Sequence, residues 1–80
     1  MRYHLNYRDP VRYFADVEGQ EFASLDAAEE EGAQSARELL GTERAEADPD
    51  FEHGVYEITD EAGLVVGKVD FSVVSGAPRR

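Results

Sequence analysis

The sequence predicts an α+β domain with the order ββαββ, in which a four-stranded antiparallel sheet carries one helix on one face. Two observations lead to this prediction. Four short stretches alternate between apolar and polar residues, as half-buried strands do. Between the second and third stretches, apolar residues recur at the spacing of a helix that buries one side. Eighty residues make one domain, which we place at 1–74, with 75–80 as a flexible C-terminal tail.

The first two strands are expected to form a hairpin. Residues 3–8 and 11–17 both alternate between apolar and polar positions. Between them, Asp9-Pro10 is a turn signal, because proline fixes its φ angle and has no backbone N–H to donate. Gly19 follows the second strand and suits a turn that needs a positive φ angle.

The alternation also assigns the side chains of this hairpin to two faces. The face expected to pack under the helix is mostly aromatic and carries these residues: Tyr3, Leu5, Tyr7 and Tyr13. The opposite face carries these residues: His4, Asn6, Arg8, Arg12 and Phe14. Since one helix covers only one side of a sheet, we expect Phe14 to be exposed on a bare face.

One helix is expected over residues 24–40. Ser24 suits the N-cap position, and acidic residues follow it in the first two turns, where the helix dipole favours negative charge. The apolar stripe consists mostly of small residues, so the helix must lie close to the sheet: Leu25, Ala28, Gly32, Ala36, Leu39 and Leu40. Gly41 suits the end of the helix, although 42–47 could continue it at a cost of about 1 kcal/mol for the glycine. Pro49 ends it in either case.

The last two strands are expected to form a second hairpin. Residues 42–53 are acidic and predict a loop, and 55–59 and 64–74 alternate as strands. The connection between them fits a type I turn followed by Gly63 in the left-handed region. Gly67 falls in mid-strand, where glycine marks a bulge or the closest approach of the helix.

Charge and composition narrow the range of partners and locations. The formal net charge is −10, and 16 of the 18 acidic residues lie between Asp16 and Glu61. Such a surface repels nucleic acids and anionic membranes, because phosphate binding depends on neutralisation by Lys and Arg. The chain has no cysteine, no long apolar run and no apolar signal segment at its start. We therefore expect a cytoplasmic protein that binds neither nucleic acid nor membrane.

The residues that favour chemistry are few, and we expect no enzyme and no cofactor. There is no cysteine nucleophile, phosphate-binding glycine loop or serine elbow. Asp16, Glu18 and Glu21 surround a glycine turn and are weak candidates for a hard cation such as calcium, which prefers six to eight oxygen ligands. Their spacing does not match an EF-hand, and hydrogen bonds to turn amides are the simpler role. His53 lies in an acidic loop that contains no nucleophile, so we expect it to be a polar surface residue and not a catalytic one.

The function that we expect from the sequence is an interaction module. A protein partner, or a second copy in a homodimer, would bind the bare sheet face or an edge strand. The expected partner-binding residues are Phe14, Arg12 and Val66, and Val74 shares their outward phase. The alternative is a regulatory domain that binds a small ligand or metal at the turn of residues 16–21.

Four motifs in one order carry a resemblance to a known family. They are Arg2-Tyr3 in the first strand, Asp16-Val17-Glu18-Gly19 with Glu21, Leu25-Asp26-Ala27-Ala28 and Asp60-Glu61-Ala62-Gly63. In this order they resemble a family of small proteins of unknown function, many from alphaproteobacteria such as rhizobia. The resemblance implies a ββαββ domain in a cytoplasmic bacterial protein and no activity. Gly32, where the family usually has alanine, and Asp9-Pro10, where it has a glycine-containing turn, depart from the pattern.

Overall fold

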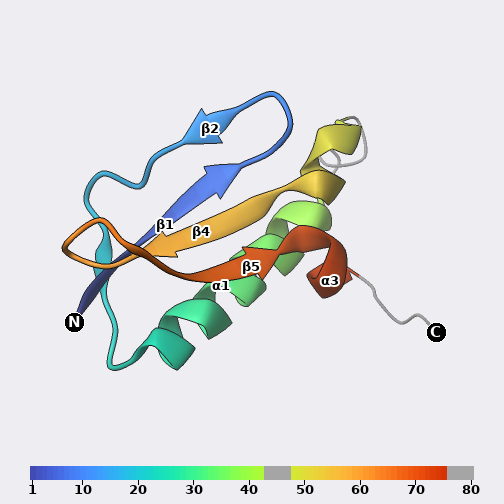
Figure 1. Ribbon diagram of the computed structural model, residues 1–80. Coiled ribbons are helices and arrows are strands. Elements are labelled where there is room, and N and C mark those ends of the chain that lie inside the picture. The colour runs from blue at the N-terminus through green and yellow to red at the C-terminus, as the bar shows by residue number, and fades with distance from the viewer. Residues whose placement is uncertain (43–47, 76–80) are drawn as a thin grey trace.

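The computed structural model describes residues 1–42 and 48–75. It confirms the predicted class: an antiparallel sheet of order β2-β1-β4-β5, with β3 also paired to β1, carries one long helix, α1, on one face (Figure 1). The elements are β1 (Arg2–Arg8), β2 (Tyr13–Phe14), β3 (Gln20–Glu21), α1 (Leu25–Leu40), η1 (Pro49–His53), β4 (Val55–Thr59), β5 (Val65–Asp70) and α3 (Phe71–Ser75). Of the alternative continuation of the helix over 42–47, residues 43–47 lie outside the described residues. The same holds for 76–80 of the tail predicted at 75–80, whereas Ser75 is the last residue of α3.

The register of the first hairpin differs from the prediction. The four residues Asp9–Arg12 form the turn, in which the Asp9 N–H donates to the Arg12 carbonyl at 2.9 Å. This turn length pairs Arg8 with Tyr13 and Tyr7 with Phe14. Paired residues point to the same face of a sheet, and a shift of one residue exchanges the faces. Phe14 therefore lies on the helix side with Tyr7, and the prediction that it occupies the bare face, with Tyr13 in the core, was wrong.

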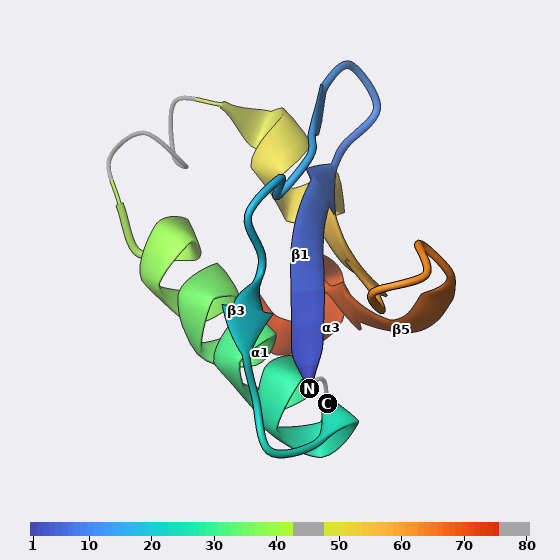
Figure 2. The same cartoon turned by 90° about the vertical axis from the view of Figure 1, so that its left-hand side faces the viewer.

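The predicted strand at 11–17 is interrupted. β2 and β3 pair with the two ends of β1, and the register between them shifts by two residues, so the segment 15–19 bulges out of the sheet (Figure 2). Asp16 holds this segment in place: its carboxylate accepts from the N–H groups of Leu5 and Gly19, each at 3.1 Å. The Asp16 N–H donates to the side chain of Asn6 at 2.9 Å. As a result Asn6 is buried, although it points away from α1.

Helix α1 begins and ends where the sequence predicts. The Ser24 hydroxyl accepts from the Ala27 N–H at 3.1 Å, and the Gly41 N–H donates to Arg37 O at 3.1 Å. The small residues of its apolar stripe are buried, and a Cβ added at Gly32 would lie 3.0 Å from Val69 Cγ2. Small side chains therefore allow the close packing of helix and sheet. None of the helices in the described part of the chain is long and apolar enough to cross a membrane.

The second hairpin forms as predicted, but its last strand is shorter. Gly63 has a φ of 86°, in the left-handed region. A one-residue bulge in β5 places Val66 opposite no partner, and a Cβ at Gly67 would lie 2.8 Å from the Glu29 carboxylate. The predicted strand at 64–74 was wrong beyond Asp70, where the chain turns into α3. The Asp70 carboxylate accepts from the Ser72 N–H at 3.1 Å and thereby favours the start of a helix.

The core consists of two neighbouring clusters between α1 and the sheet. One contains Tyr3, Ala28, Ile58 and Val69, near the start of the helix. The other lies near its end and contains Tyr7, Ala36, Phe51 and Phe71. Tyr56 and Val74 pack against both clusters, so Val74 faces inward and its predicted outward position was wrong.

Candidate functional site

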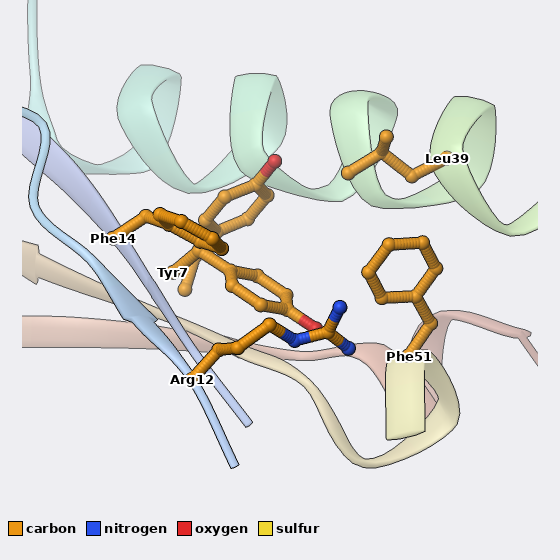
Figure 3. Close-up of a pocket in the computed structure, with 6 residues that line it drawn as sticks. Tyr7, Arg12, Phe14, Leu39 and Phe51 are labelled. Atoms are coloured by element: carbon orange, nitrogen blue, oxygen red, sulfur yellow. The ribbon is translucent and has the colours of Figure 1, made fainter. Parts of the chain in front are cut away.

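A groove of about 350 Å³ opens beside the second core cluster, between the first hairpin, the end of α1 and η1 (Figure 3). It is lined by Tyr7, Arg12, Phe14, Leu39, Phe51 and Tyr56, and we call it the aromatic groove. Phe14 is 60% exposed at its mouth and stacks on Tyr7 with a centroid distance of 6.1 Å. Leu39 and Phe51 approach from α1 and η1 (Figure 3). Most of the lining is therefore apolar and aromatic.

A buried carboxylate holds the polar end of the aromatic groove together. One oxygen of Asp9 accepts from the backbone N–H groups of Val11 and Arg12, at 2.9 and 2.7 Å. The other accepts from the Tyr7 hydroxyl at 2.6 Å and from Arg12 Nε at 2.9 Å. The turn that sets the hairpin register therefore also fixes the side chains of Tyr7 and Arg12, two residues that line the groove.

Arg12 connects this turn to η1. Its Nη2 atom lies 2.7 Å from the Asp9 carboxylate and 2.8 Å from the Asp48 carboxylate; the angles make these ionic contacts rather than hydrogen bonds. The guanidinium also lies 5.1 Å from the centre of the Phe51 ring (Figure 3), a cation–π distance. Asp48 in turn accepts from the Asp50 N–H at 3.1 Å and caps η1. One arginine thus joins two segments about forty residues apart in sequence.

The protonation states in this network are fixed at neutral pH. Burial alone would raise the pKa of Asp9, but hydrogen bonds from Tyr7, Val11 and Arg12 outweigh it and lower the pKa to about 2. Burial and the hydrogen bond to Asp9 raise the pKa of Tyr7 well above its ordinary value. The hydrogen bond to Asp9 also raises the pKa of Arg12. Asp9 is thus a weak base, and the Tyr7 phenol keeps its proton.

We expect the Asp9 carboxylate to make part of the stability dependent on acid pH. Its folded pKa of about 2 lies below the ordinary aspartate value of about 3.9. A lowered pKa contributes stability above the unfolded value, and this contribution is lost as the pH falls from about 4 to about 2. Urea unfolding of the wild type and of Asp9→Asn from pH 6 to 2 should show a difference in free energy that narrows over this range.

Glu61→Gln is the matched control, because Glu61 is an exposed carboxylate in the turn of the second hairpin. The free energy of unfolding of Glu61→Gln should stay close to that of the wild type from pH 6 to 2. If the Asp9→Asn difference were equally flat from pH 6 to 2, the Asp9 carboxylate would not be stabilised by the hydrogen bonds described above.

Two of the three residues predicted to bind a partner lie together in the aromatic groove. Phe14 and Arg12 are adjacent there, although the prediction placed both on the bare face. Val66 lies at the bulge of β5, away from the groove. On the bare face, Arg8 pairs with Glu57 at 3.0 Å and lies over the Tyr13 ring at 4.4 Å, so this part of the face is mostly charged.

Two of the three candidate carboxylates in the acidic turn at residues 16–21 contact other groups of the protein. The Asp16 carboxylate accepts from the turn amide of Gly19, as the simpler alternative predicts, and from the Leu5 N–H of β1. Glu21 lies 3.6 Å from Arg2 Nε. The Glu18 side chain is exposed. Among residues 1–42 and 48–75, no three His, Asp or Glu side chains come together as metal ligands.

Several groove residues were not predicted as site residues. Tyr56 and Leu39 appear in the sequence as ordinary core positions, and Phe51 lies in a segment predicted as loop. Asp48-Pro49 was interpreted only as the end of a helix. An aspartate before a proline is also a helix N-cap pattern, and this signal could have predicted η1 and placed Phe51 on it.

The fold and the site together define a small α+β domain with an aromatic groove beside a partly buried Asp–Arg–Asp network. The chain belongs to the DUF6894 family, a domain of unknown function, whose model matches residues 2–72. A search of curated proteins and a search of solved structures each gave no match. The match confirms the predicted membership in a family of unknown function over nearly the whole chain.

Proposed function

We propose that the protein is a non-catalytic interaction module and that the aromatic groove receives an apolar side chain of a protein partner. The observation that carries the proposal is Phe14, a large aromatic residue that is 60% exposed at the mouth of an apolar groove. Aromatic side chains are enriched among the residues that dominate binding energy at protein interfaces. The walls of the groove belong to the core, so the site is preformed.

A different protein fits this site better than a second copy of the chain. Each copy carries a net charge of −10, so two copies repel each other. The edge strand β5 carries Lys68 near its middle and a bulge at Val66, two features that hinder pairing with another strand. These features favour a partner over homodimerisation.

The proposed function involves no catalysis, no cofactor and no nucleic-acid or membrane partner. Asp9 is a poor base, because its carboxylate is ionised and surrounded by donors, and Tyr7 retains its proton. The acidic surface disfavours polyanions. Cytoplasmic location and the alphaproteobacterial origin stay predictions that rest on the sequence.

Phe14→Ala is expected to abolish partner binding while leaving the protein folded. Aromatic anchors at interfaces commonly contribute about 2 kcal/mol or more to binding. The loss of the stacking on Tyr7 should destabilise the fold by only about 0.5–1.5 kcal/mol. The test compares the proteins that co-purify with the tagged wild type and with the variant from host cells, with circular dichroism to check folding.

Val17→Ala is the matched control, because Val17 is an apolar residue that is 84% exposed outside the groove. It should retain every partner of the wild type. The proposal would be wrong if Phe14→Ala and Val17→Ala captured the same proteins in the same amounts as the wild type.

A further inference from the structure

Building on the proposed function, we propose that the partner segment is basic: it places one large apolar side chain in the aromatic groove and a lysine or arginine beside Asp48. An arginine in an aromatic groove commonly indicates an anion site. Here the charges around Arg12 point to the opposite chemistry.

Arg12 is the only charged residue among the described residues that line the groove, and neighbouring carboxylates already compensate its positive charge. It faces two carboxylates, Asp9 at 2.7 Å and Asp48 at 2.8 Å. The formal charges of two carboxylates and one guanidinium sum to one negative charge. An anion entering the groove would meet a network that is already net negative, whereas a cation would complete the charge balance.

Asp48 is the carboxylate of this network that a partner can reach, and the Arg12 side chain beside it is exposed to the same extent. Its side chain is 28% exposed, while the Asp9 side chain is fully buried. The residues next in sequence to the groove walls are also acidic: Glu38 precedes Leu39, and Asp50 and Glu52 flank Phe51. The chain on either side of Leu39 and Phe51 therefore carries mostly negative charge, with Arg37 as the basic residue in the last turn of α1.

The size of the groove fits a single side chain of a partner better than a larger ligand. Its volume of about 350 Å³ is at the small end for ligand pockets and is open to solvent at Phe14. The exposed Phe14 ring would pack against the apolar anchor, and its face would also attract a neighbouring cation. A leucine or phenylalanine next to an arginine or lysine satisfies both requirements.

Three probes with one phenyl ring and different charges test this inference on the full chain. 3-Phenylpropylammonium is a cation, 3-phenylpropan-1-ol is neutral and 3-phenylpropanoate is an anion, and all three have the same number of carbon atoms. Amide chemical shifts should move at Phe14, Phe51 and Gly54, with the cation binding about fivefold tighter than the neutral probe, as one accessible ion pair allows. The anion should bind weakest, and the advantage of the cation should shrink in high salt.

The outcomes separate the two proposals. If none of the probes shifts these amides, the groove does not accept an apolar side chain, and the proposed function fails together with the inference. If the neutral probe or the anion binds as tightly as the cation, the groove is a docking site but the partner is not basic, and only the inference fails.

Asp48→Asn isolates the residue that carries the charge preference. Asparagine can still accept from the Asp50 N–H and cap η1, so the fold should persist. The preference for the cation should fall to less than twofold, whereas Asp26→Asn, an exposed change at the far end of α1, should retain it. If Asp48→Asn kept the full preference for the cation, the assignment of this preference to Asp48 would be wrong. If the variant does not fold, the wild type provides the test: a preference for the cation that does not shrink in high salt contradicts the assignment.

Discussion

Replacing Phe71 by alanine should remove a large part of the stability of the protein. Phe71 is fully buried, and its ring lies 5.6 Å from the ring of Tyr7 and 5.1 Å from the ring of Tyr56, measured between centroids. Truncation of a buried phenylalanine costs about 3–5 kcal/mol, through lost burial and the cavity that remains. A domain of this size has roughly 4–12 kcal/mol in total. Urea unfolding followed by circular dichroism should show this loss.

Val73→Ala is the control in the same short helix. Val73 is 74% exposed, so its truncation should change the free energy of unfolding by less than about 0.5 kcal/mol. A loss below about 1 kcal/mol for Phe71→Ala would mean that the chain after β5 does not pack against the core. Backbone chemical shifts of residues 72–74 offer a second check, since they should indicate a helix and not an extended strand.

Replacing Gly54 by alanine is expected to destabilise the fold by about 1–3 kcal/mol, the usual cost of overpacking a core. Gly54 has a φ of −73°, which any residue can adopt, so backbone strain plays no part. The added Cβ would lie 2.7 Å from Tyr7 Cε1 and 3.2 Å from the Phe51 carbonyl. Tyr7 is held by aromatic neighbours and by its hydrogen bond to Asp9, so its ring cannot move away without breaking these contacts.

Gly41→Ala provides the matched glycine control. Gly41 has a φ of −84°, and a Cβ there would meet only carbonyl oxygens at ordinary contact distances of 3.5 and 3.7 Å. Its free energy of unfolding should change by less than about 0.5 kcal/mol. If thermal or urea unfolding gave equal effects for both variants, Gly54 would not be in close contact with the Tyr7 ring.

Phe71→Ala and Gly54→Ala change the fold and the proposed site together, whereas Phe14→Ala changes the proposed site alone. Tyr7 and Phe51 belong to the core and at the same time line the aromatic groove, so core changes should disturb the groove as well. Phe14 belongs to the groove alone, because it is mostly exposed. A loss of binding in Phe14→Ala with a folded protein is therefore the result that concerns function and not stability.

The sequence by itself determined β1, α1 and β4 with nearly their observed boundaries, and the turn of the second hairpin. Alternation located β1 and β4, because a half-buried strand repeats every two residues. Ser24 and Gly41 located the ends of α1, because caps satisfy the free N–H and C=O groups of a helix. Gly63 located the second hairpin turn. All these signals are local, so they can be recognised without knowledge of the rest of the chain.

Only the tertiary structure decided the facing of Phe14, the helix at the C-terminal end and the groove itself. Alternation gives the period of a strand but not its phase relative to a neighbour, and the length of the Asp9–Arg12 turn exchanged the faces of Tyr13 and Phe14. Residues 71–75 alternate well enough for a strand but form α3, where Phe71 packs between Tyr7 and Tyr56. The aromatic groove joins residues from three separate segments, and Arg12 meets Asp48 only after the chain has folded. Long-range contacts of this kind leave no periodic signal in a sequence.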